Sequence, residues 1–150
     1  MRAVLQRVTT ASVTVDSNVT GSIGHGLLIL LGISPADEDS DLQWLVKKII
    51  GMRIFSDKDG KMNHSIVDAG GSFLVVSQFT LQASTKKGNR PSYIGAARPE
   101  KAEPMYTRFC QLLAQQSSLA VETGIFGADM KVQLLNDGPV TILLDSKVKE

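Results

Sequence analysis

A run of five large aliphatic residues at positions 27–31 constrains the fold of this chain more than any other feature. The run is far too short to span a bilayer, which takes about 20 apolar residues in a helix. Short apolar runs bounded by turn residues are typical of strands that are buried on both faces. Gly26 precedes the run and Ser34-Pro35 interrupts the chain soon after it. The sequence therefore predicts a central strand with packed layers on both sides.

The other periodic segments predict two helices and several more strands. Apolar residues at one-face spacing indicate a helix over residues 37–52, and four acidic residues crowd its start, where the helix dipole favours anions. Pro99 suits the first turn of a second helix, which runs to about Gln116. Strands are expected over residues 2–16 and 72–81, and short strands close the chain around Val121, residues 132–134 and residues 140–144.

The order of these elements predicts an α/β (α+β) fold in a single domain, residues 1–150. A length of 150 residues argues for one domain and buries roughly 68–70% of the unfolded surface. The expected strands are grouped towards both ends of the chain. We therefore expect a curled antiparallel or mixed β-sheet that approaches a barrel, with two main helices packed outside it.

Composition narrows the functional classes. The formal net charge is only +1, so any contact with nucleic acid must be local. One cysteine, Cys110, rules out an intrachain disulfide, and its apolar neighbours in the second helix indicate a small buried side chain. The chain has two separated histidines and no His-Glu-x-x-His motif, so no metal or other cofactor is expected. The polar residues among the first ten argue against a signal peptide and favour a cytoplasmic location without a membrane anchor.

The end of the second apolar strand reads Ser77-Gln78-Phe79-Thr80-Leu81. On its residues alone, this run is a strand end with alternating polar positions. Thr80 is the only evident nucleophile in it, but no histidine is near in sequence, so a Ser-His-Asp type of triad is poorly supported. Backbone N–H groups at the strand end offer another chemistry, the stabilisation of a tetrahedral oxyanion.

A second run, Asn136-Asp137-Gly138-Pro139-Val140-Thr141, lies near the C-terminus. Asp-Gly is a strong hairpin signal, whereas proline removes a backbone donor and restricts the residue before it. From these residues alone, a tight turn between two strands is the favoured interpretation.

Two further segments leave alternatives open. The run at positions 124–130 is either a glycine-flanked bend with core residues Phe126 and Met130, or a surface on which a nucleobase packs. A polar loop over residues 82–98 carries Lys86, Lys87 and Arg90. These cations are either solvated or in contact with phosphates.

Together, the two runs and the opening Met1-Arg2-Ala3-Val4-Leu5-Gln6-Arg7-Val8 closely resemble the D-aminoacyl-tRNA deacylase (D-tyrosyl-tRNA deacylase) family. The resemblance covers nearly the whole chain, because both the spacing of the runs and the length fit. It implies a hydrolase that cleaves the ester between a D-amino acid and the 3′ end of tRNA, a proofreading step in translation. It also implies a homodimer.

The resemblance further implies a role for each run. The Gly138-Pro139 bond is expected to be cis and to reach into the active site of the partner subunit, where its carbonyls exclude L side chains. Arg7 is expected to hold this motif. Such a device also leaves glycyl-tRNA as a substrate, because glycine has no side chain to exclude. Glycine at 138 lets the backbone approach the ligand closely.

The resemblance implies that Ser77, Gln78, Phe79 and Thr80 form the catalytic part of the site. Gln78 and Thr80 are expected to position the reacting groups rather than to transfer protons. The 2′-hydroxyl of the terminal adenosine is expected to assist the attack of water. Phe126 and Met130 are expected to contact the adenine.

Two other functional classes stay open on the sequence. One is a non-catalytic module that binds the 3′ end of tRNA. The other is a related editing domain that removes a mischarged L-amino acid from tRNA. The Gly138-Pro139 pair argues against the second class, because it should exclude L side chains.

Overall fold

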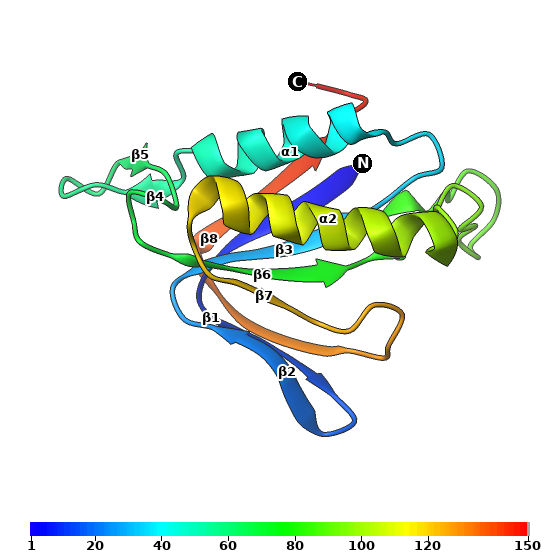
Figure 1. Ribbon diagram of the computed structural model, residues 1–150, viewed down its shortest axis with the longest axis horizontal. Coiled ribbons are helices and arrows are strands. Elements are labelled where there is room, and N and C mark those ends of the chain that lie inside the picture. Colours follow the sequence, from blue (N-terminus) through cyan, green and yellow to red (C-terminus); the bar gives the residue numbers. More distant parts are fainter. Residues whose placement is uncertain (150) are drawn as a thin grey trace.

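The computed structural model describes residues 1–149, and six of its strands form one mixed sheet that curls towards a barrel (Figure 1). The long strand β1 pairs with β3 along its first half, with β2 along its second half and with β8 along nearly its whole length. Strands β3, β6 and β7 run parallel to one another. The six strands are β1 (Arg2–Val15), β2 (Asn18–Ile23), β3 (Gly26–Gly32), β6 (Ser72–Ser77), β7 (Val121–Thr123) and β8 (Lys131–Asp145).

Two helices, α1 (Asp39–Gly51) and α2 (Pro99–Ser117), lie side by side over one face of this sheet (Figure 1). A small hairpin of β4 (Phe55–Ser56) and β5 (Met62–His64) follows α1. A short 3-10 helix, η1 (Phe79–Gln82), follows β6. No helix in residues 1–149 is long and apolar enough to cross a membrane.

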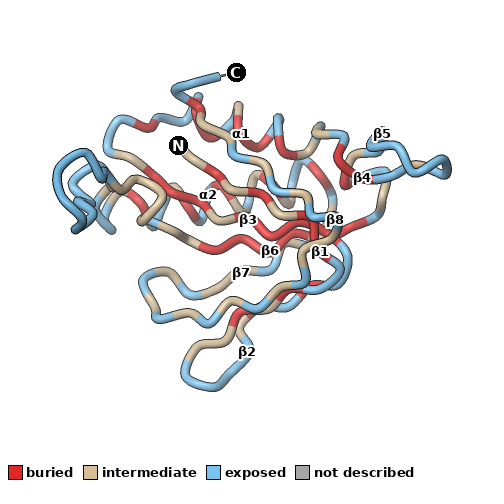
Figure 2. The backbone as a smooth tube through the Cα atoms, turned by 180° about the vertical axis from the view of Figure 1, so that it is seen from behind, coloured by how far each residue is buried: buried red, intermediate tan, exposed pale blue. Residues whose placement is uncertain are grey.

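The central strand divides the core into two parts. Leu27, Ile29 and Leu31 of β3 pack with the helices, whereas Leu28 packs on the other face with residues of β1, β2 and β6. Figure 2 shows the buried residues concentrated in the middle strands of the sheet and on the inner side of α1. The apolar run at positions 27–31 is therefore buried on both faces, as its composition predicts.

The expected fold class is confirmed, with a curled mixed sheet and two helices outside it. The first helix begins two residues later than expected, at Asp39. Cys110 is half-buried against the helix-side core, and burial raises the pKa of its thiol to about 11.

Two expectations about strand ends are wrong. The strand that begins at Ser72 ends at Ser77 rather than at residue 81, because Gln78 leaves the extended conformation and the chain turns into η1. The two short strands expected near the C-terminus are one continuous strand, β8, and no hairpin turn separates them. Pairing with β1 on both sides of the Asp-Gly pair overrides the local turn signal.

Candidate active site

Strand β8 contains a wide bulge opposite Arg7. Gln6 pairs with Thr141 and Val8 pairs with Asn136, so Arg7 alone faces the four residues 137–140, named here the β8 bulge. The amide of Asn136 closes the base of this bulge, because its nitrogen donates to the carbonyl of Arg7 at 2.9 Å and to that of Val140 at 3.0 Å. Bulges of this kind commonly re-aim backbone near functional sites.

Arg7 holds the β8 bulge from the core side. Its side chain is buried, and Nε lies 3.1 Å from the Asp137 carboxylate and donates to the Asp137 carbonyl at 3.2 Å. Its Nη1 donates to the carbonyl of Ile54 at 2.6 Å. Without the family resemblance, the expected interpretation of Arg7 is an arginine on a strand with its side chain in solvent. That interpretation is wrong here. The guanidinium instead ties three parts of the chain together.

Gly138 and Pro139 form the exposed tip of the β8 bulge, and the peptide bond between them is cis. Gly138 has φ +125°, and a Cβ built on it would lie 2.8 Å from Cγ2 of Val140 and 3.1 Å from Nη2 of Arg7. Both the backbone conformation and the space around it require glycine at this position.

A cavity of about 600 Å³ lies at the other end of the central strands, where β6 ends. Ser77, Gln78 and Phe79 form one part of its wall, and Phe126 and Met130 form another. The structure therefore brings together two runs that are nearly 50 residues apart in sequence. Phe126 and Met130 are half-buried: each packs against one part of the core and also lines the cavity.

Thr80 lies beside this cavity rather than on its wall. The amide nitrogen of Gln78 donates to Oγ1 of Thr80, so the two polar side chains form one unit. The first N–H groups of any helix have no acceptor within the helix. Among the described residues, the N–H groups of Phe79 and Thr80 at the start of η1 have no backbone acceptor.

Sequence reasoning missed several residues of the cavity wall. Tyr93, Arg98 and Asp129 line it together with the start of α2. Tyr93 sits in a loop of small and polar residues, where no periodicity marks it. The only sequence signal for Tyr93 is that it is a lone aromatic residue in such a loop. Its place in the site becomes clear only from its contact with Phe79 in the structure.

The β8 bulge does not contribute to the cavity of its own chain within residues 1–149. Arg7 pairs with Leu27, whereas Ser77 pairs with Leu31. Four residues of strand separate these positions, which corresponds to about 13 Å. The two predicted parts of the site are therefore at opposite ends of the central strands in a single chain.

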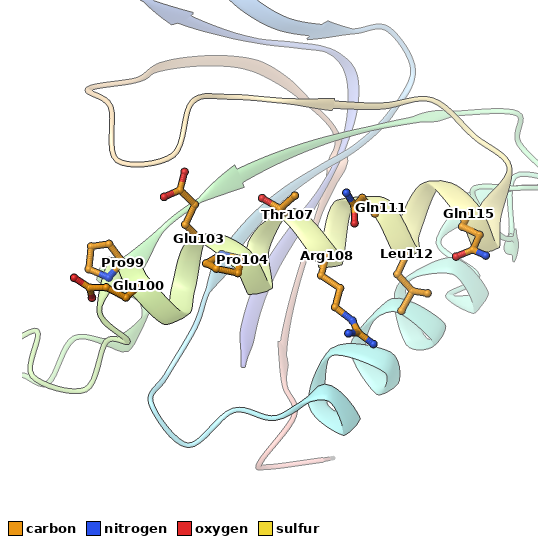
Figure 3. A pocket seen from close by; sticks show the side chains of 9 residues that line it. All are labelled: Pro99, Glu100, Glu103, Pro104, Thr107, Arg108, Gln111, Leu112 and Gln115. Carbon is orange, nitrogen blue, oxygen red and sulfur yellow. The ribbon is translucent and has the colours of Figure 1, made fainter.

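A second, shallower hollow of about 860 Å³ runs along the outer side of α2 (Figure 3). Arg108 reaches from it towards α1, where its Nη2 lies 2.8 Å from the Asp39 carboxylate. None of the residues that the sequence singles out for chemistry lies on its wall. Across residues 1–149, no three His, Cys, Asp or Glu side chains are grouped as metal ligands.

Comparison with known proteins identifies the family. The family model described as D-Tyr-tRNA(Tyr) deacylase matches residues 4–145. The D-aminoacyl-tRNA deacylases of Parabacteroides distasonis and Bacteroides thetaiotaomicron are 57% and 59% identical to this chain, each over 150 residues and the whole of both proteins.

Solved structures share the fold of this chain. The c-Myc DNA unwinding element binding protein is 44% identical, with a TM-score of 0.91 over 97% of this chain and 98% of that chain. A probable eukaryotic D-amino acid tRNA deacylase has the same fold, with a TM-score of 0.80 at 17% identity over 95% of this chain and 97% of that chain. This chain belongs to the D-Tyr-tRNA(Tyr) deacylase family.

Proposed function

We propose that this protein hydrolyses the ester bond of D-aminoacyl-tRNA and releases the free D-amino acid and tRNA. One observation carries the proposal: in a chain of this family, a single cavity is lined by Ser77, Gln78 and Phe79 on one part of its wall and by Phe126 and Met130 on another. The reaction uses neither a metal nor another cofactor. We place it in the cytoplasm, as a quality-control step of translation.

In the proposed reaction, water attacks the ester carbonyl carbon, and the bond to the ribose oxygen breaks. The N–H groups of Phe79 and Thr80 stabilise the oxyanion of the tetrahedral intermediate, which forms after the attack and before the bond breaks. Gln78 and Thr80 fix the geometry of this strand end through their mutual hydrogen bond. The 2′-hydroxyl of the terminal adenosine assists the attacking water, and the proton ends on the leaving ribose oxygen.

The terminal adenine packs on Phe126 and Met130, a half-buried aromatic ring and a thioether on the cavity wall. Stacking on such surfaces is the usual way in which proteins hold an unpaired base. The contact recognises an adenosine without reading tRNA sequence, which suits an enzyme that acts on many charged tRNAs.

Selection against L-amino acids comes from the β8 bulge of the partner subunit. An enzyme that accepts many D side chains cannot use a fitted side-chain pocket. Backbone placed against Cα of the substrate rejects one hand by steric clash. The exposed tip at Gly138 and Pro139, held by the buried Arg7, has the rigidity that this task needs.

The active unit in this proposal is a homodimer, because the β8 bulge and the cavity are at opposite ends of one chain. A two-fold interface would bring the bulge of each subunit to the cavity of the other. Leu135 and Leu143 of β8 are 61% and 68% exposed and provide apolar surface that such an interface could cover. Sedimentation of the purified chain should give a dimer, and a fully active monomer would contradict the proposal.

The central experiment compares the deacylation rates of D-alanyl-tRNA and L-alanyl-tRNA at equal enzyme concentration. We expect rapid release of D-alanine and near-background release of L-alanine. Binding without turnover of either ester would instead indicate a non-catalytic module for the tRNA 3′ end. Preferred turnover of the L ester would indicate an editing domain.

A further inference from the structure

The segment over residues 83–98, named here the basic arm, concentrates the positive charge of the protein. It contains Lys86, Lys87, Arg90 and Arg98 and no acidic residue. The rest of the chain holds 12 basic and 15 acidic residues, a formal net charge of −3. A protein with almost no net charge therefore has one strongly cationic segment, and an anionic partner would meet it there.

The basic arm is anchored at the mouth of the cavity. Ser84 and Ser92 exchange two backbone hydrogen bonds of 2.8 and 2.9 Å, which close the loop that holds three of the cations. The N–H of Ala97 donates to the carbonyl of Ile33 at 2.9 Å and ties the end of the arm to the residue that follows β3. In Figure 1 the arm is the yellow-green loop at the end where α2 begins.

An exposed aromatic pair, Tyr93 of the arm and Phe79 of η1, lies on the cavity wall. The rings of Phe79 and Tyr93 meet edge to face with their centroids 5.1 Å apart, and both residues line the cavity. Phe79 is 57% exposed and Tyr93 is 42% exposed, and the neighbouring Ile94 is 91% exposed. Large apolar side chains this accessible, beside a cluster of cations, form the usual combination for binding single-stranded nucleic acid.

We propose that the basic arm and Tyr93 bind the unpaired nucleotides that precede the terminal adenosine of tRNA. A base of this segment stacks on Tyr93 beside Phe79, and Lys86, Lys87 and Arg90 contact its phosphates. Every base has a face that can stack, so these contacts hold the 3′ end without reading its sequence. This inference rests on the proposed function, because it takes the terminal adenosine to lie in the cavity.

The charge contribution is tested by equilibrium binding of uncharged tRNA at several salt concentrations. The variant Lys86→Gln/Lys87→Gln/Arg90→Gln should bind more weakly, and its plot of log affinity against log salt should be less steep by about 2, the value for three contacts to single-stranded phosphates. The control Lys47→Gln/Lys48→Gln/Lys149→Gln removes the same charge from exposed residues of α1 and of the C-terminal segment beside it. An equal loss in both variants would overturn the proposal, because only global charge would then matter.

The location on the RNA is tested with tRNA that lacks all of its unpaired 3′-terminal nucleotides. The difference between the wild type and the arm variant should disappear with this truncated tRNA, since the groups that the arm contacts are gone. An undiminished difference would mean that the arm binds the duplex part of tRNA, and the proposal would be wrong.

The stacking contact is tested with Tyr93→Ala and Tyr93→Phe. We expect Tyr93→Ala to weaken the binding of intact tRNA about fivefold or more, whereas Tyr93→Phe keeps the ring and binds within about twofold of the wild type. An equal loss of Tyr93→Ala with intact and truncated tRNA would assign this side chain to the fold rather than to a base.

These measurements use uncharged tRNA and contain no ester. They therefore stand apart from the test of the proposed function. Loss of hydrolysis with intact arm-dependent binding would reject the enzyme but keep the arm. If hydrolysis is normal and the arm variants bind tRNA like the wild type, the proposed enzyme activity is kept and the role of the arm is rejected.

Discussion

Nε of Arg7 contacts both the carboxylate and the backbone carbonyl of Asp137, at 3.1 and 3.2 Å, across the widest irregularity in the sheet. The same guanidinium donates to the carbonyl of Ile54. A buried cation therefore fixes the one exposed backbone segment that the proposed function uses for chiral selection. The two roles of Arg7, in stability and in selectivity, can be separated by experiment.

Arg7→Ala should reduce both stability and the preference for D over L esters. Lost hydrogen bonds from a charged donor should lower the free energy of unfolding by about 3 kcal/mol, measured by urea denaturation. The released bulge should reduce the ratio of D-alanyl to L-alanyl deacylation at least tenfold, an effect of about 1.4 kcal/mol on relative barriers. Asp137→Asn is the matched control, because it keeps the backbone carbonyl that Arg7 binds. If the folded Arg7→Ala variant has an unchanged ratio of D-alanyl to L-alanyl deacylation, Arg7 has no role in selectivity.

Gly138→Ala should destabilise the chain by about 1–3 kcal/mol. An alanine Cβ would meet Val140 and Arg7, and φ +125° is strained for any L side chain. The comparison is Gly24→Ala, where a Cβ would have nothing within 4 Å and φ lies outside the left-handed region. Urea denaturation of the two variants side by side measures the difference. Equal midpoints for both would show that the β8 bulge accepts side chains.

Asp41 should contribute stability that disappears in acid. Burial raises the pKa of its carboxyl, but hydrogen bonds from Lys147, at 2.7 Å, and from the N–H of Glu38 outweigh burial and lower the pKa to about 2. A pKa lowered in the folded state means that the contribution is complete above pH 4 and is lost as the pH falls towards 2. Because Lys147 is half-exposed, we expect only about 1–2 kcal/mol from the ion pair.

The corresponding measurement is the free energy of unfolding of Asp41→Asn at pH 7, 4 and 2.5. The deficit relative to the wild type should be largest at pH 7 and small at pH 2.5. Asp39→Asn, in the same helical turn, should show little change at any pH, because Asp39 and its partner Arg108 are both well exposed. A deficit in Asp41→Asn that is independent of pH would mean that packing, not charge, is responsible.

Thr80→Ala should retain activity within about tenfold of the wild type. Thr80 lies beside the cavity, and the N–H groups proposed for the oxyanion belong to the backbone. Removal of a covalent nucleophile costs roughly a millionfold in kcat in a serine hydrolase. A substrate with a 2′-deoxy terminal adenosine should react much more slowly than the normal ester with either enzyme. An acyl group trapped on Thr80 would reverse this assignment.

The predictable part of this fold is the part with strong periodicity. The run at positions 27–31 predicts its own burial, because each face of β3 meets a separate apolar layer. The one-face spacing of α1 predicts the helix that covers one of those layers. In both cases the local pattern and the tertiary environment favour the same structure.

The unpredictable part depends on contacts between distant residues. Asn136 to Pro139 have the composition of a hairpin turn, yet β8 continues through them, because β1 offers pairing partners on both sides. The burial of Arg7 follows from carbonyls at Ile54 and Asp137, which no local pattern links to it. At the strand end, the polar residues after Ser77 carry no signal that separates an extended strand from the 3-10 turn. The family resemblance supplied the functional significance of these positions, whereas their geometry comes from the structure.

Glycyl-tRNA should be a substrate if chirality is screened by backbone at Gly138 and Pro139. Such a screen rejects an L side chain by clash and makes no contact that requires a D side chain. Glycine has no side chain to clash, so its ester should enter the cavity as D-alanyl ester does. One missing methyl group changes binding by only about 1–3 kcal/mol in an apolar pocket. Discrimination against glycine should therefore be modest, while discrimination against L-alanine should be large.

The measurement is the deacylation rate of D-alanyl, glycyl and L-alanyl esters on one and the same tRNA. The glycyl rate should lie much closer to the D-alanyl rate than to the L-alanyl rate. Arg7→Ala should raise the L-alanyl rate relative to the D-alanyl and glycyl rates, because it loosens the backbone at Gly138 and Pro139 and adds no contact to a D side chain. A glycyl ester as resistant as the L-alanyl ester would rule out steric exclusion, because only a positive contact to the D side chain could then explain the selectivity. The cell would need separate protection for correctly charged glycyl-tRNA if the prediction holds.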